Sequence, residues 1–275
     1  MKKFKVGLQL FSVRNEMEKD MEDTLKRVKD MGYDNVEFAG YFGKTAEEVK
    51  ELLDKYGLDC ASVHQGIDPF REQGQPAYDY IKTIGVSYDA IPGYNIKYYL
   101  DDWDGTIERF TEVGKRMKEN GIQLLYHNHD FEFRKIDGEY IMDKLYRTIP
   151  EQYLQPEFDT CWIHYAGINP SEYIKQYDGR CKVLHLKDFI CKNISDGPIY
   201  DIIKEADERS SVETRPERGF EFRPVGYGVQ NFEEIIKSAE DIGVEYLIVE
   251  QDASPSGNPL SDAKKSREYL KSIGI

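Results

Sequence analysis

The chain has 275 residues, and its 37 basic and 51 acidic side chains give a formal net charge of −14. Such acidity disfavours contact with phosphate backbones, so we expect no nucleic-acid partner. The apolar share is 40%, and no apolar run approaches the roughly 20 residues of a membrane span, so we also expect no membrane insertion. The length suits a single α/β barrel, whose usual size is about 250 residues.

The N-terminal segment and the cysteines bear on the compartment. Residues 1–16 enter a strand pattern directly, without the apolar region of a secretory signal. Cys60, Cys161, Cys181 and Cys191 form no Cys-x-x-Cys pair, and three of them stand in apolar, strand-like runs where a buried thiol is the ordinary interpretation. We therefore expect a cytoplasmic protein.

Short apolar runs alternate with amphipathic segments along the whole chain. The first run, Lys5–Phe11, predicts a strand, and the helix after it ends at Gly32. Thr45 and Glu48 have the spacing of a capping box at the start of the second helix. The further expected strands are 35–40, 59–64, 87–92, 122–127, 154–159, 182–188 and 246–252. The further expected helices are 45–57, 76–84, 106–121, 140–148, a short one after Pro170, 231–243 and 261–274.

Eight strand–helix units in strict alternation predict a parallel sheet, and eight units in one domain predict closure into a single (β/α)8 TIM barrel over residues 1–275. A doubly wound open sheet is the alternative, but no Gly-x-Gly-x-x-Gly follows the first strand. One connection is much longer than the others. Residues 190–229 are polar and rich in charge, and we expect this loop to lie over the C-terminal face of the barrel.

Polar and titratable residues stand at the C-terminal ends of six expected strands, which converge on one site in a barrel. They are Glu37, His64, His127, Asn128, His129, Asp130, Asp159, His185, Lys187, Asp188, Glu250, Gln251 and Asp252. Strands five to eight thus contribute His127, Asp159, His185 and Glu250, a set suited to Mn²⁺, Zn²⁺ or Fe²⁺. Alternation along a strand also predicts that His127 and His129 share a face.

Each of these residues also has an ordinary structural interpretation. A single strand histidine is more often a satisfied polar group than a ligand, and Asp159 could cap the helix that follows it. Glu250 follows four apolar residues, and burying it without a partner would be costly. The four strand ends together favour a metal site.

The sequence resembles the sugar phosphate isomerase/epimerase superfamily, the xylose isomerase-like TIM barrels, over nearly its whole length. The resemblance lies in the motifs GLQLFSVR, GYDNVEFAGYFG, SVH, YHNHDFEF, FDTCWIHYAGINP, VLHLKD, PVGYGVQNF and YLIVEQD. These motifs are specific for the superfamily but not for one substrate. The branch with YHNHDFEF is similar to enzymes that act on oxidised or keto sugars, including inosose-type dehydratases, oxo-glucoside lyases and C-glycoside-cleaving subunits.

The resemblance implies one divalent metal ion held by Glu, Asp, His and a second Glu from strands five to eight. Asp159, His185 and Glu250 match three of these positions. His127 stands where the family has its first Glu, with His129 as the alternative ligand. The departure puts a two-glutamate epimerase mechanism in doubt. Mn²⁺ is the first expectation, with Zn²⁺, Mg²⁺, Co²⁺ and Fe²⁺ as alternatives.

These observations predict a metal-dependent sugar isomerase or epimerase that abstracts a proton beside a carbonyl. Glu250 and His129 are the expected acid/base residues. The expected substrate contacts are Glu37, His64, Glu132, Trp162 and Lys187. One alternative is a dehydratase or lyase acting on an inosose or a 3-oxo-glycoside.

Two further classes stay open. The chain could be a non-catalytic or partner-dependent sugar-binding subunit. Phosphodiester cleavage, as in related endonuclease barrels, is disfavoured by the small ligand set and the acidity. The expected partner is a small sugar or keto-sugar, and a homo-oligomer is compatible with the sequence.

Overall fold

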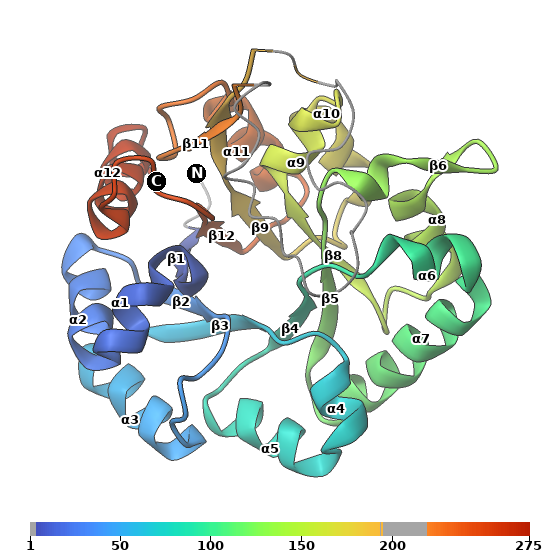
Figure 1. Ribbon diagram of the computed structural model, residues 1–275, viewed down its shortest axis with the longest axis horizontal. Helices are drawn as coiled ribbons and strands as arrows, with labels where there is room; N and C mark the ends of the chain where they lie inside the picture. Colours follow the sequence, from blue (N-terminus) through green and yellow to red (C-terminus); the bar gives the residue numbers. More distant parts are fainter. Residues whose placement is uncertain (1–3, 193, 195–218) are drawn as a thin grey trace.

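The computed structural model describes residues 4–192, 194 and 219–275. Eight parallel strands close into a barrel in the order β1, β12, β9, β8, β5, β4, β3 and β2, and helices surround it (Figure 1). The strands are β1 (Lys5–Gln9), β2 (Asn35–Phe38), β3 (Asp59–His64), β4 (Tyr88–Ile91), β5 (Gln123–His127), β8 (Gln155–Asp159), β9 (Val183–Leu186) and β12 (Tyr246–Val249). The predicted (β/α)8 barrel is therefore confirmed.

The longer helices follow the predicted order around the barrel. They are α2 (Met21–Met31), α3 (Ala46–Tyr56), α5 (Gln75–Thr83), α7 (Trp103–Glu119), α8 (Ile141–Thr148), α11 (Phe232–Asp241) and α12 (Pro259–Ser272). The short helices are α1 (Arg14–Lys19), α4 (Asp68–Glu72), α6 (Ile96–Asp101), α9 (Thr160–Tyr165) and α10 (Pro170–Tyr173). Only the last of these short helices was expected from the sequence.

Local side-chain chemistry sets several of these boundaries. Thr45 and Glu48 form the predicted capping box, in which each side chain accepts a hydrogen bond from the other residue's backbone N–H. α2 ends at Gly32, whose φ of 93° favours glycine. β1 stops at Gln9, two residues earlier than expected, because the Gln9 side chain accepts the Phe11 N–H and starts a 3₁₀ turn over Leu10–Val13.

Two small antiparallel sheets lie outside the barrel and were not predicted. β6 (Lys135–Ile136) pairs with β7 (Glu139–Tyr140), and β10 (Asp188–Ile190) pairs with β11 (Glu221–Arg223). The second pair joins the two ends of the predicted 190–229 loop. Most of that loop, residues 193 and 195–218, lies outside the described residues, so its position over the barrel stays a prediction.

Among the described residues, no helix is long and apolar enough to cross a membrane. The four cysteines are free thiols, and Cys60, Cys161 and Cys181 are buried as the sequence indicated.

Apolar side chains form three separate clusters among the described residues, one of which packs Trp162 against Phe189, Phe220 and Phe222. The largest cluster lies between the strands and the helices, and α7 contributes Phe110, Val113 and Met117 to it. A small core of Ala90, Leu125, Val183 and Ile248 fills the barrel interior. This inner core closes the lower part of the barrel, so polar side chains further along the strands lie above it.

A substitution at Gly114 can test the close packing of α7. A Cβ built at this position would overlap the backbone carbonyl of Tyr153, which cannot move aside as a flexible side chain could. We expect Gly114→Ala to destabilise the protein by about 1–3 kcal/mol in urea unfolding, despite the better helix propensity of alanine. Glu108→Ala on the exposed face of the same helix should change stability by less than about 0.5 kcal/mol. Equal effects of the two substitutions would contradict this packing argument.

Candidate metal centre

Strand alternation brings the predicted ligands together above the inner core. Leu125, Val183 and Ile248 point inward, so the residues two positions further along point inward as well. These residues are His127, His185 and Glu250, and the neighbouring strand β8 adds Asp159 beside His185 in the sheet register. Ligand atoms of these four side chains all lie within 4.8 Å of one another, and all four side chains are buried.

The upper part of this cluster has a definite arrangement. His127 Nε2 lies 3.6 Å from Asp159 Oδ2 and 4.0 Å from Glu250 Oε2. His185 Nδ1 lies 2.9 Å from the same Glu250 oxygen. Ligand atoms around an ion at about 2.1 Å are separated by roughly 3–4 Å, so these spacings suit a divalent cation.

Lys187 places an ammonium group against the same carboxylates. Its Nζ lies 2.8 Å from Asp159, 3.0 Å from Glu250 and 3.0 Å from Asp252, and its side chain is almost fully buried. This side chain follows β9 two residues after His185, so it points to the same interior. The ammonium balances part of the negative charge of the upper cluster.

A second set of polar side chains lies deeper in the barrel. Glu37 on β2 and Glu157 on β8 are fully buried, and His64 Nε2 lies between them at 3.1 and 2.7 Å. Glu37 also accepts hydrogen bonds from Gln9 Nε2 at 2.6 Å and from the Ser62 hydroxyl. We call Glu37, Glu157 and His64 the lower layer.

The carboxyl groups of the upper cluster differ in their pKa values. Burial raises the pKa of Asp159, although Lys187 opposes this effect. Burial also raises the pKa of Asp252, to about 6. Burial acts on Glu250 in the same direction, but Lys187 and His185 outweigh it and hold the pKa of Glu250 below its ordinary value. Glu250 is therefore the carboxylate that stays ionised most readily.

The histidines fall into two groups by charge. Burial lowers the pKa of His127 well below its ordinary value, with help from His185 and His64, and burial lowers the pKa of His129 to about 3. Burial has the same tendency at His64, but Glu37 and Glu157 outweigh it and raise the pKa of His64 to about 10. The pKa of His185 rises well above its ordinary value because Glu37 and Glu157 outweigh burial there too. His127 and His129 thus keep neutral rings with a lone pair to offer.

The chain leaves the strand between the two neighbouring histidines of β5. β5 ends at His127, so His129 is not placed by the strand alternation that the sequence analysis used. Instead, Asn128 accepts a hydrogen bond from the Asp159 N–H at 2.9 Å and fixes the turn against β8. The His129 ring still lies beside the cluster, with its centroid 5.4 Å from that of His127 and 5.8 Å from that of Trp162.

Several residues that were predicted to contact the substrate are buried in the structure. Both carboxylate oxygens of Glu132 accept hydrogen bonds, one from the Tyr126 hydroxyl at 2.6 Å and one from the His129 N–H at 2.8 Å. Trp162 is fully buried, stacks on Phe220, and has Lys187 Nζ 5.3 Å from its ring centroid. Glu37 and His64 belong to the lower layer. Substrate contact by these residues stays a prediction, as it does for Lys187 beside the upper carboxylates.

Glu157 is a buried carboxylate of the site that was not among the residues predicted from the sequence. Glu157 stands two residues before Asp159, so strand alternation alone could have placed it on the inner face. Asp188 has a structural role that differs from the roles of its neighbours, and no sequence signal indicated it. Its carboxylate accepts hydrogen bonds from the N–H groups of Gly226, Gly228 and Gln230 at 3.0, 2.8 and 3.2 Å, which fastens this returning loop to the start of β10.

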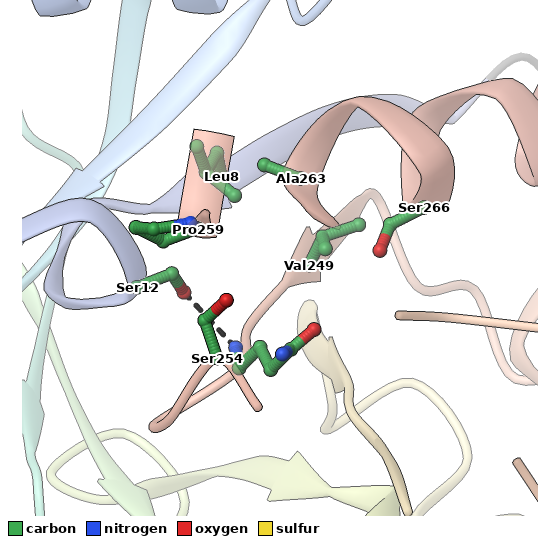
Figure 2. Close-up of a pocket in the computed structure, with 8 residues that line it drawn as sticks. Leu8, Ser12, Val249, Ser254, Pro259, Ala263 and Ser266 are labelled. Carbon is green, nitrogen blue, oxygen red and sulfur yellow. Dashed lines mark hydrogen bonds between the residues drawn. The ribbon is translucent and has the colours of Figure 1, made fainter. Parts of the chain in front are cut away.

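The strand end that carries Glu250 is also fastened from outside the barrel. The Ser12 hydroxyl accepts a hydrogen bond of 3.0 Å from the N–H of Gln251, the residue after Glu250, and Figure 2 shows Ser12 beside Ser254 at the adjoining cavity. The contact borders a cavity of about 10 Å³ lined in part by the hydroxyls of Ser12, Ser254 and Ser266, a size that suits one water molecule. This anchor limits the movement of Glu250.

The four upper side chains fit a resident divalent ion. Two imidazoles and two carboxylates are donors that Mn²⁺, Zn²⁺ and Fe²⁺ accept, and they come from four successive barrel strands, β5, β8, β9 and β12. They also lie at the C-terminal face, where TIM barrels place their active sites. The structure therefore contains a buried cluster that could hold a metal ion.

The family model for xylose isomerase-like TIM barrels matches residues 25–273. The chain belongs to this family. An inosose dehydratase from Clostridium perfringens is 31% identical, and the alignment covers 92% of this chain and 90% of the relative. A sugar phosphate isomerase/epimerase from Parabacteroides distasonis has a similar structure, with a TM-score of 0.73, 25% identity and coverage of 100% of this chain and 96% of that one.

A more distant solved structure has the same fold. An L-ribulose 3-epimerase superposes with a TM-score of 0.65 at 14% identity, covering 98% of this chain and 94% of that chain. A relative of this chain by sequence is thus a dehydratase, and the fold is shared with an epimerase.

A substitution at Lys187 can test whether its ammonium balances the charge of the upper cluster. We expect Lys187→Met to lower the stability of the metal-free protein by about 3–5 kcal/mol, because it leaves buried carboxylates without their ammonium partner. Urea unfolding after chelator treatment measures this loss. Lys175→Met, which removes an exposed ion pair with Glu172, should cost less than about 1 kcal/mol. Similar losses for the two variants would show that Lys187 does not balance a buried charge.

Proposed function

We propose that this chain is a metal-dependent enzyme that removes a proton from the carbon beside a carbonyl of a sugar or keto-sugar. The observation that carries the proposal is the buried set of His127, Asp159, His185 and Glu250, with the neutral His129 beside it. These four side chains are the proposed metal ligands. Mn²⁺ is the first candidate, and a bound divalent cation would polarise the carbonyl and stabilise the charge that develops on its oxygen.

The residues of this chain have separate roles in the proposed reaction. His129 takes the proton from carbon, which its neutral ring permits, and the electron pair of the broken C–H bond moves onto the carbonyl oxygen. The ammonium of Lys187 lies beside the upper carboxylates and favours that negative oxygen. Glu250 serves as the opposite acid/base group. Return of the proton to the neighbouring carbon gives isomerisation, and return to the other face gives epimerisation.

Dehydration is the second candidate, and the relatives support it. The C. perfringens protein that is 31% identical over 92% of this chain is an inosose dehydratase. The first step is the same proton removal, after which a hydroxyl on the next carbon leaves as water. The choice between these outcomes depends on the substrate, so one experiment with several sugars can separate them. The cytoplasmic location stays a prediction that rests on the free cysteines.

Metal binding is the first test of the proposal. We expect chelator-treated protein to bind one equivalent of Mn²⁺ in calorimetry. Asp159→Ala and Glu250→Gln should each weaken binding by more than about 100-fold, since each removes a direct ligand rather than an outer contact. Glu112→Gln, an exposed acid on α7, serves as the control. If wild type and both ligand variants bind equally weakly, the assignment of the site is wrong.

Deuterium exchange is the second test. Ketoses, inososes and 3-oxo-glucosides incubated with the enzyme in D₂O should show exchange at one carbon by NMR, and loss of water would identify a dehydratase. His129→Asn should slow exchange by about 10²–10⁴-fold while metal affinity stays unchanged. His164→Asn is the matched control, because His164 lies outside the cluster and contacts Gln230 at 2.7 Å.

The outcomes separate the classes of function. Exchange at the wild-type rate in His129→Asn would remove His129 from the mechanism. Exchange that appears only after addition of a second protein would favour the partner-dependent subunit over an enzyme that acts alone.

A further inference from the structure

His127 and His185 each lie between an upper and a lower carboxylate. His127 directs Nε2 toward Asp159, at 3.6 Å, and Nδ1 toward Glu157, at 3.5 Å. His185 directs Nδ1 toward Glu250, at 2.9 Å, and Nε2 toward Glu37, at 2.8 Å. The two rings therefore face the upper cluster through different nitrogen atoms.

The lower carboxylates are held in place and enclosed. Glu37 and Glu157 are fully buried, and the inner apolar core lies below them. His64 bridges the two, and Gln9 and Ser62 also donate to Glu37. Each carboxylate faces a proposed metal ligand. This contact gives it a role that requires no contact with a substrate.

A neutral imidazole can bind a metal ion only through the nitrogen that carries no proton. The other nitrogen keeps its N–H and needs an acceptor, which in metal sites is commonly a carboxylate. In a histidine ligand two tautomers compete, whereas a glutamate ligand has no such ambiguity. His127 stands where the resemblance implies glutamate, so this position has an added requirement for a partner that fixes the ring.

We propose that Glu157 and Glu37 are positioning residues that fix opposite tautomers of His127 and His185. Glu157 accepts the Nδ1–H of His127 and leaves Nε2 for the ion, while Glu37 accepts the Nε2–H of His185 and leaves Nδ1. The inference rests on the proposed metal site. Nδ1 of His127 and Nε2 of His185 are both buried and make no hydrogen bond of good geometry in the metal-free arrangement. Their contacts with Glu157 at 3.5 Å and with Glu37 at 2.8 Å should therefore become hydrogen bonds when the ion binds.

A different interpretation of the same residues is a second metal ion. His64, His127, Glu157 and His185 also have ligand atoms within 4.8 Å of one another. His64 argues against it, because its Nε2 already lies 2.7 Å from Glu157 and 3.1 Å from Glu37. An imidazole thus lies between the lower carboxylates, as the Lys187 ammonium lies beside the upper ones, and the number of ions that the wild type binds decides between the two interpretations.

Imidazole ¹⁵N shifts of the Zn²⁺-loaded full chain test the proposal directly. Zn²⁺ is diamagnetic, and the chain has five histidines, so single His→Gln variants at 64, 129 and 164 allow assignment. We expect His127 to carry its proton on Nδ1 and His185 to carry its proton on Nε2. If both rings carry the proton on the same nitrogen, the proposal is overturned. Metal coordination alone would also favour this pattern in the wild type, so the same spectra are recorded for Glu157→Gln and Glu37→Gln. Mixed tautomers in these variants support the positioning role, and an unchanged single pattern in both overturns it.

Metal affinity gives the second measurement. Glu157→Gln and Glu37→Gln should each weaken Co²⁺ binding by about 10–100-fold and shift the visible Co²⁺ spectrum. Asp89→Asn is the matched control, because Asp89 is equally buried on β4 but stands next to the inward-facing Ala90 and so points out of the barrel. Thermal unfolding without metal shows whether a variant is folded, and the NMR result stands if one is not.

The possible results separate the two levels of the argument. If wild type binds one ion and both glutamine variants bind it as tightly, the positioning role is wrong while the proposed function survives. If wild type binds two ions and Glu157→Gln binds one, the lower layer is a second metal site and the positioning role is overturned. If wild type binds none, the proposed function fails and this inference fails with it.

Discussion

The pairing of buried charges in the upper half of the barrel constrains the rest of the structure. Glu37, Glu157, Asp159 and Glu250 are all buried, and each would cost several kcal/mol if left without a partner. Lys187 pairs with the upper carboxylates. His64 lies between the two lower ones, and those carboxylates raise its pKa to about 10. The partners come from different strands, so the charges balance only when the barrel is closed.

The surrounding loops serve this arrangement by fixing the strand ends. Asn128 holds the backbone of Asp159, Ser12 holds the residue after Glu250, and Asp188 holds the loop at 226–230. A metal or substrate site needs side chains held close to their working positions, and backbone anchors of this kind provide that. The anchors use short polar side chains beside the site, so the site residues themselves remain available for chemistry.

The sequence predicts the fold well because each unit carries its own signals. Periodic apolar residues, the Thr45–Glu48 capping box and the glycine at position 32 act locally, and the structure has the predicted elements at those places. The grouping of His127, Asp159, His185 and Glu250 was also accessible, because strand ends meet on one face of a barrel. These inferences need only periodicity and topology.

Contacts between side chains of distant strands could not be predicted from the sequence in the same way. The position of His129 depends on a turn fixed by Asn128, because β5 ends at His127, two residues before it. The pairing of His64 with both Glu37 and Glu157 depends on barrel closure and register. β10 and β11 are joined across a long segment, so neither short strand has a local signal strong enough to identify its partner.

The exchange of glutamate for His127 has an electrostatic consequence. The ligand set that the resemblance implies has three carboxylates and so gives a net charge of −1 with a divalent ion. The proposed set in this chain has two carboxylates, Asp159 and Glu250, so the same ion would give a neutral centre. The ammonium of Lys187 beside it is paired with Asp252 as well, at 3.0 Å, so the immediate surroundings are close to neutral rather than negative. A site of this charge favours a substrate whose oxygen becomes negative during the reaction, which is the charge change that proton removal beside a carbonyl produces.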